Sequence, residues 1–301
     1  MSLRLAYYPG CTLKTNARNY EISALASSKA LGIELIELPR WNCCGTVHAL
    51  AKDDVMHYIA PVRNLIRVEQ LKSSGLVDGE RLVTLCEMCY NTLKRADIGV
   101  KEDQERRRKL REVMEEEPPY GGGGVEVIHL LQLIREVGWE RVKKRVVRPL
   151  KGLRVAPYYG CLLLRPRGLG IDDANNPTIF ERLIESLGAE VVGIPFKAKC
   201  CGSYQTVHMG HVASELSYRI LRQAVEGKAD VITLACPLCE YNLGERQGEI
   251  RGLFPDLKYI PVLYFTQLIA LAFGLEDSVG LEMNNPDPRP LLRMKGFLRE
   301  A

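Results

Sequence analysis

The chain has 301 residues, of which 46% are hydrophobic and 26% are charged, a balance typical of a globular protein. This length suits about two domains, each with a core of its own. The net charge of +4 is too small to indicate a nucleic-acid partner, and we expect none. The ten cysteines are too few for a disulfide-rich small scaffold, so they need another explanation.

The sequence shows no secretory signal and no membrane span. After Met1 no basic segment followed by a long apolar run is present. The most apolar stretch, 261–275, is shorter than the roughly 20 residues that a membrane span needs. We therefore expect a cytoplasmic protein, in which clustered cysteines indicate metal or redox chemistry rather than structural disulfides.

The sequence repeats itself, and every cysteine belongs to one of the two copies. The segment LAYYPGC at 5–11 is echoed by VAPYYGC at 155–161, WNCCG at 41–45 by AKCCG at 198–202, and LVTLCEMC at 82–89 by ITLACPLC at 232–239. We therefore predict two duplicated domains, at 1–150 and 151–301.

Within each half, short strand-like runs alternate with longer helix-like segments, which predicts parallel β-α-β units. The predicted elements, in chain order, are a strand at 3–7, a helix at 19–31, a strand at 34–38, a helix at 48–71 and a strand at 81–85, then a strand at 153–157, a helix at 177–187, a strand at 190–194, a helix at 207–225 and a strand at 230–234. The charged segment 101–117 is expected to form a solvated helix, and 118–124, with two prolines and four glycines, a loop. The predicted fold is α/β, with two pseudo-symmetric, Rossmann-like halves that each contain a short parallel sheet.

Each cysteine motif follows the C-terminal end of a predicted strand. The loops beyond these ends form the binding crevice of open α/β sheets. Three loops would therefore bring five thiols together in each half. The two expected sets are Cys11, Cys43, Cys44, Cys86 and Cys89, and Cys161, Cys200, Cys201, Cys236 and Cys239.

The adjacent pair Cys43-Cys44 limits which centre the thiols can hold. Four ligands suffice for zinc or for a cubane iron–sulfur cluster. Neighbouring residues rarely point both thiolates at one tetrahedral ion, whereas a centre with several metals accepts adjacent thiolates more readily. The pattern therefore favours a multi-iron cluster, with zinc and a Cys43–Cys44 disulfide as alternatives.

The doubled pattern resembles the cysteine-rich CCG domain, present twice, as in the B-type subunit of heterodisulfide reductase. The motifs that carry this resemblance are YYPGC at 7–11, WNCCG at 41–45 and CPLCEYNL at 236–243. The resemblance implies two noncubane [4Fe–4S] clusters, one per half, each held by its own five cysteines, with a disulfide substrate between them. The chain has no ferredoxin-type motif and no GxGxxG loop, so electrons must arrive from another subunit. The resemblance implies that a ferredoxin-like iron–sulfur subunit of the C type and a flavoprotein subunit of the A type are the partners.

Two departures from the family pattern bear on function. The first copy has 41 residues between Cys44 and Cys86, against 34 between Cys201 and Cys236, so one cluster with zinc in the first domain is an alternative. Leu162 stands where members that reduce the methanogen heterodisulfide often have a histidine. This favours a relative that acts on another sulfur compound. Oxidation of that compound, the reverse of disulfide reduction, is one option.

Further candidate residues lie near the cysteine loops. His48 and His208 are candidates for proton transfer, with helix capping or surface exposure as the alternative. The basic residues that could bind an anionic substrate are Lys14, Arg18, Arg165, Lys197 and Lys199.

The leading functional prediction is an oxidoreductase subunit of a larger complex, acting on a disulfide, a thiol or a sulfane-sulfur compound or carrier. The first alternative is an electron-transfer or anchor subunit, as in atypical succinate dehydrogenases or lactate and glycolate oxidation complexes. The second is a zinc-stabilised scaffold.

Overall fold

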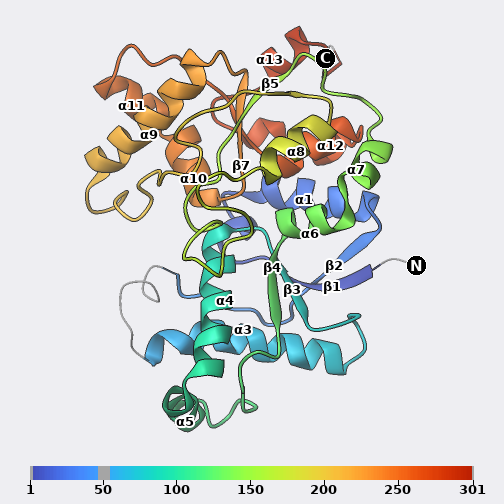
Figure 1. Cartoon of the computed structure of the whole chain (residues 1–301), viewed down its shortest axis with the longest axis vertical. Coiled ribbons are helices and arrows are strands. Elements are labelled where there is room, and N and C mark those ends of the chain that lie inside the picture. The colour runs from blue at the N-terminus through green and yellow to red at the C-terminus, as the bar shows by residue number, and fades with distance from the viewer. Residues whose placement is uncertain (1–2, 47–54, 300–301) are drawn as a thin grey trace.

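Two four-stranded parallel sheets, one in each half of the chain, form the framework of the computed structural model, which describes residues 3–46 and 55–299 (Figure 1). The strand order is β2-β1-β3-β4 in the first sheet and β6-β5-β7-β8 in the second. The same order in both halves confirms the predicted α/β fold with two pseudo-symmetric, Rossmann-like halves.

The first half begins with a strand and a short 3₁₀ turn and ends with two short helices. Its elements are β1 (Leu3–Tyr8), a 3₁₀ turn (Thr12–Lys14), α1 (Arg18–Ala30), β2 (Ile33–Glu37), α3 (Met56–Ser73), β3 (Arg81–Thr84), α4 (Glu87–Glu102), α5 (Gln104–Val113), β4 (Glu126–His129), α6 (Leu130–Val137) and α7 (Trp139–Arg145).

The second half repeats this order and adds a C-terminal segment. Its elements are β5 (Arg154–Pro157), α8 (Ile179–Ser186), β6 (Glu190–Val191), α9 (Gly210–Glu226), β7 (Val231–Leu234), α10 (Pro237–Glu240), a π-helical turn (Tyr241–Glu245), α11 (Gln247–Leu253), β8 (Val262–Tyr264), α12 (Phe265–Ala272), two 3₁₀ turns (Glu276–Ser278 and Leu281–Met283) and α13 (Arg289–Met294).

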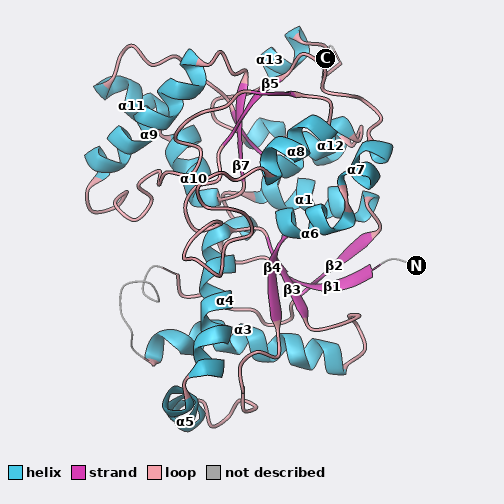
Figure 2. Ribbon diagram, in the orientation of Figure 1, coloured by secondary structure: helices cyan, strands magenta, loops and turns pink. Residues whose placement is uncertain are grey.

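Helices α1, α6, α8 and α12 lie between the two sheets, so the halves share a core (Figure 2). The ring of Tyr20 in α1 stacks on Tyr264, with ring centroids 4.1 Å apart. The Tyr20 hydroxyl donates to the backbone carbonyls of Leu85 at 2.8 Å and Ala235 at 3.3 Å. These carbonyls belong to equivalent residues just before Cys86 and Cys236, so one buried tyrosine ties the two cysteine loops together.

The fourth strand of each sheet was not predicted from the sequence. Strand β4 passes directly into α6, and β8 passes directly into α12, with no loop between strand and helix. Because the apolar residues of strand and helix form one continuous run, the change of period is hidden. Strand β6 is shorter than the predicted 190–194, since Gly193 and Pro195 both disfavour strand structure.

A mostly exposed helix, α5, lies within the predicted 101–117, but the bounds of the prediction are wrong. Helix α4 continues to Glu102, and Asp103 has extended backbone angles that end it. The Asp103 carboxylate accepts the backbone N–H of Arg106 at 2.9 Å and thereby caps α5. Leu110 of α5 is buried in a small apolar cluster with Val62, so this helix is only partly solvated. The loop prediction for 118–124 is confirmed.

Candidate metal centre

The structure brings the five cysteine thiols of the first half together at the carboxyl ends of β1, β2 and β3. Cys44 Sγ lies 3.5 Å from Cys89 Sγ. The Cys11 and Cys44 thiols both contact Cys43, and the Cys86 thiol contacts Cys89. Parallel strands place their carboxyl ends at one edge of the sheet, which is why three loops far apart in sequence converge here.

The second half repeats this arrangement. Cys201 Sγ lies 3.5 Å from Cys239 Sγ. The Cys161 thiol contacts Cys200, which contacts Cys201, and Cys236 contacts Cys239. All ten cysteines lie within the described residues, and all are free thiols. The alternative of a Cys43–Cys44 disulfide is therefore not met in the structure.

The two thiol groups meet at the junction of the halves. The thiols of Cys86 and Cys236 form a hydrogen-bonding contact, and both residues are buried. In Figure 1 this is the place where the N-terminal end of α4 approaches α10. At the other end of the first group, Cys11 and Cys43 are exposed. The first thiol group therefore extends from the protein surface to the buried junction.

Neighbouring thiols shift one another's pKa values in opposite directions. Hydrogen bonds from the Cys236 and Cys89 thiols hold the pKa of Cys86 well below its usual value, and backbone N–H groups of the first turn of α4 add to this effect. In the second half, hydrogen bonds from Cys161 and Cys201 lower the pKa of Cys200 to about 2. The partner thiols are shifted the other way, since the hydrogen bonds with Cys44 and Cys200 raise the pKa values of Cys89 and Cys161.

Two buried tyrosines hold the CCG loops in equivalent ways. The Tyr8 hydroxyl donates to the backbone carbonyl of Asn42 at 2.8 Å, and the Tyr158 hydroxyl donates to that of Lys199 at 2.7 Å. Each accepting residue immediately precedes its cysteine pair. From the sequence alone, these tyrosines align the two copies but have no assigned role. Their equivalent positions in the repeat were the available signal for a shared role.

Gly10 and Gly160 let the backbone pass close beside the thiols. Both glycines have a positive φ. A Cβ atom on Gly10 would lie 3.2 Å from Cys89 Sγ, and one on Gly160 would lie 3.4 Å from Cys239 Sγ. The backbone therefore passes close beside the thiols without a side chain in between. With five sulfur donors in each set, the residues fit a thiolate-bound metal centre.

The two candidate histidines stand differently in the structure. His208 is exposed in the turn before α9. His48 lies outside the described residues. A role of either histidine in proton transfer stays a prediction.

Three of the five basic candidates have partners within the chain. Lys14 forms ion pairs with two carboxylates at 2.6 and 2.7 Å, and Lys197 forms one at 2.6 Å. Arg165 donates to two backbone carbonyls at 3.1 and 3.2 Å. Arg18 and Lys199 are exposed. Lys14 and Arg165 are exposed as well, and substrate binding by these five residues stays a prediction.

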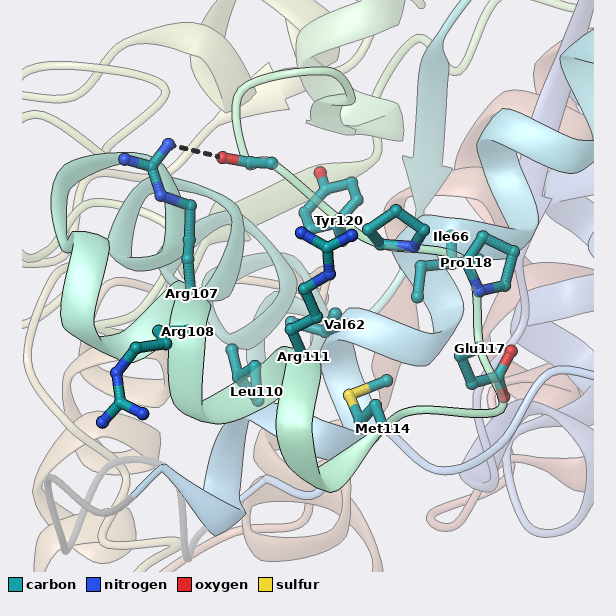
Figure 3. Close-up of a pocket in the computed structure, with 12 residues that line it drawn as sticks. Val62, Ile66, Arg107, Arg108, Leu110, Arg111, Met114, Glu117, Pro118 and Tyr120 are labelled. Carbon is teal, nitrogen blue, oxygen red and sulfur yellow. Dashed lines mark hydrogen bonds between the residues drawn. The ribbon is translucent and has the colours of Figure 1, made fainter.

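A pocket of about 520 Å³ lies away from the cysteines, between α3, α5 and the loop at 117–121 (Figure 3). Apolar side chains including Val62, Ile66 and Met114 line it together with Arg107 and Arg111. It lies near the C-terminal end of α4, whereas Cys89 lies in the first turn of that helix. The pocket is therefore not part of the candidate metal centre.

Comparison with known proteins agrees with the resemblance drawn from the motifs. Residues 5–94 and 155–244 both match the CCG family, described as a cysteine-rich domain. The chain belongs to this family.

It is 31% identical, over 97% of its length, to the 8-methylmenaquinol:fumarate reductase membrane anchor subunit of Wolinella succinogenes, which is covered completely. It is 29% identical to the B-type subunit of the ferredoxin:CoB-CoM heterodisulfide reductase of Methanosarcina mazei, over 93% of each chain. The predicted membership in the family of heterodisulfide reductase B-type subunits is confirmed.

A solved structure supports the fold of this family member. A hypothetical protein from Helicobacter pylori superposes with a TM-score of 0.74 over 93% of this chain, at 13% identity. The chain spans about half of that protein, 51%. At this identity the likeness concerns the fold alone. Among the described residues, no helix combines the length and apolar character needed to cross a membrane.

Proposed function

We propose that this family member is an iron–sulfur redox subunit with two noncubane [4Fe–4S] clusters, one per half. Each cluster would be held by the five cysteines of its own half. The observation that carries this proposal is the presence of two equivalent groups of five thiols that meet at Cys86 and Cys236. An all-sulfur donor set with an adjacent pair suits several irons better than one zinc ion.

The proposed reaction is two-electron chemistry on a disulfide, a thiol or a sulfane-sulfur compound, with oxidation of sulfur as one direction. Two clusters that exchange one electron each would supply the two electrons that a disulfide bond requires. Cys11 and Cys43 are exposed and Cys161 and Cys200 are half-buried, so a small sulfur compound or a carrier-bound one can approach these sides of the site. Exposed Lys199 beside Cys200 is the cation best placed to bind an anionic substrate.

The proposed setting is a cytoplasmic complex. A ferredoxin-like iron–sulfur subunit and a flavoprotein subunit would deliver or remove electrons. Support comes from relatives whose names describe them as subunits of heterodisulfide reductase.

A second candidate function is that of an electron-transfer or anchor subunit. The full-length match to a fumarate reductase membrane anchor subunit favours it, as does Leu162 in place of a histidine. In this function the buried contact between Cys86 and Cys236 would join the two redox centres, and no sulfur substrate would bind.

The two candidates are separated by electron paramagnetic resonance of the reduced, anaerobic protein. Addition of organic disulfides or persulfides should alter a cluster signal if the protein performs sulfur chemistry. If these compounds leave every signal unchanged while a quinone reoxidises the clusters, the electron-transfer function is correct. A protein with zinc and no iron would exclude both.

A further inference from the structure

Glu87 belongs to the first half, but its side chain points into the thiol group of the second half. It lies between Cys86 and Cys89 in the sequence. Nevertheless one of its carboxyl oxygens and the sulfur atoms of Cys236 and Cys239 all lie within 4.8 Å of one another. Glu87 is 2% exposed, so the carboxyl group is inside the protein.

The carboxyl group is only partly satisfied. It accepts a hydrogen bond from the backbone N–H of Leu163, in the loop that follows Cys161. Its Oε1 atom has no hydrogen-bond partner within the part of the chain that the structure describes. No ion pair between described residues involves Glu87. A buried oxygen without a partner needs an explanation, and beside Glu87 the sulfur atoms of two candidate ligands, Cys236 and Cys239, point to a group bound there.

Gly160 of the second half leaves space for this carboxyl group. A Cβ atom on Gly160 would lie 2.8 Å from Glu87 Oε2, so the glycine leaves room for the acid. The equivalent Gly10 faces Cys89 and the ring of Tyr8 instead. The residue that corresponds to Glu87 in the second copy is Pro237, which has no polar side-chain atom to offer the first half.

We infer that Glu87 contacts the second half's cluster directly and acts as a sixth protein group of that site, supplied by the first half. This inference rests on the proposed function. The carboxylate can act as an oxygen ligand of an iron held by Cys236 or Cys239, or, as a carboxylic acid, its O–H can donate a hydrogen bond to a sulfur of the cluster. Both contacts change the reduction potential of a cluster. The first half would therefore set the potential of the second cluster.

The test compares Glu87→Gln with wild type in the anaerobic, iron-loaded protein. We expect the equilibrium constant for reduction of the second cluster to change by about tenfold, the size expected for the loss of a contact with a charged group. The first cluster should keep its potential. Potentials are measured by redox titration followed by paramagnetic resonance, with Cys43→Ala and Cys200→Ala used to assign each signal to one half.

Glu240 provides a matched control. It too is a buried glutamate beside a cluster cysteine, with an unpartnered Oε1 among the described residues. A Cβ atom on Gly244 would lie 2.5 Å from Glu240 Oε1. Burial, together with the nearby Glu245 carboxylate, raises the pKa of Glu240 to about 8, and no thiol is among the causes of this shift. Glu240→Gln should therefore leave both potentials close to those of wild type.

Mössbauer spectroscopy separates the two kinds of contact. If Glu87 is an iron ligand, Glu87→Gln changes the parameters of one iron in the second cluster; if it forms a hydrogen bond, only the potential changes. Glu87→Asp, which withdraws the carboxyl group by one methylene, should give a shift in either case. Two intact clusters whose potentials and iron parameters match wild type in both variants would overturn the inference while leaving the proposed function standing. A wild-type protein without iron would instead overturn the proposed function.

Discussion

The two halves share strand order and cysteine pattern, but they differ in where the helix after the CxxC motif makes its contacts. In the first half, Asn91 of α4 donates to the carbonyls of Leu162 and Arg165 in the second half, at 3.0 and 2.7 Å. In the second half, the side chain of Asn242 bonds within its own half, where its Oδ1 accepts a hydrogen bond from the Thr206 hydroxyl at 3.0 Å. The duplication has thus kept the residues that position the thiols, while the residues around them have diverged.

The halves also differ in length without moving their cysteines. The first copy has seven more residues than the second between its adjacent pair and its CxxC motif. The loop between α3 and β3 takes three of them, α3 takes one, and the segment before α3 takes three. The three residues added between α3 and β3 lie at the amino end of β3, away from the cysteines, and the distance from Cys44 Sγ to Cys89 Sγ equals that from Cys201 Sγ to Cys239 Sγ, 3.5 Å.

The largest expected effect is the loss of one cluster at a time. Cys200→Ala should remove the second cluster and leave the first, and Cys43→Ala should do the reverse, because the sets use separate thiols. Iron content should fall by about half in each variant. Iron analysis and paramagnetic resonance check this. Loss of both clusters from either single variant would show that the halves are not independent sites.

Lowering the pH should weaken the junction through His129. Burial lowers the pKa of His129 to about 4, although its ring contacts the carbonyl of Leu85 at 2.7 Å. The unfolded chain has a histidine pKa of about 6.5, so the unfolded state binds more protons between these values. The contribution of neutral, buried His129 to the free energy of unfolding is complete above pH 6.5. It is lost as the pH falls to about 4, by up to about 3 kcal/mol.

Denaturant unfolding of wild type and His129→Gln at several pH values measures this effect. The second half has Tyr264 at the equivalent place, which does not titrate in this range. The variant should show a flatter dependence of unfolding free energy on pH below 6.5. An equal slope in both proteins would contradict the assignment to His129.

Asn91→Ala should cost less, about 1–3 kcal/mol of stability, because it removes two partly buried hydrogen bonds across the junction. Asn242→Ala should have a similar cost but act within the second half. Chemical unfolding gives both values, and proteolysis of the loop at 162–170 separates them. Faster cleavage of this loop is expected only for Asn91→Ala; equal cleavage in the two variants would show that α4 does not hold it.

The smallest effects are expected at the exposed cations. Arg18→Ala and Lys199→Ala should change stability by no more than about 0.5 kcal/mol, since both side chains are exposed. If the second half binds an anionic sulfur substrate, only Lys199→Ala raises the apparent KM. A larger rise with Arg18→Ala would move substrate binding to the first half.

The sequence was sufficient to predict the repeat, the first three strands of each half and the convergence of the thiols, because the motifs and the apolar alternation are local signals. It did not reveal β4 and β8, whose apolar residues merge with those of the following helices. Glu87 was also missed, since its neighbours Cys236 and Cys239 lie about 150 residues away and no periodicity connects them. The available signal was an acidic residue inside a CxxC motif where the second copy has Pro237.

The central claim is that two equivalent groups of five thiols hold iron–sulfur clusters. Metal analysis of the anaerobically purified, full-length chain tests it most directly. Two [4Fe–4S] clusters require about eight iron atoms per chain with an equal amount of acid-labile sulfide. Two zinc ions per chain without iron would contradict the claim, and about four irons with one zinc would limit it to a single half.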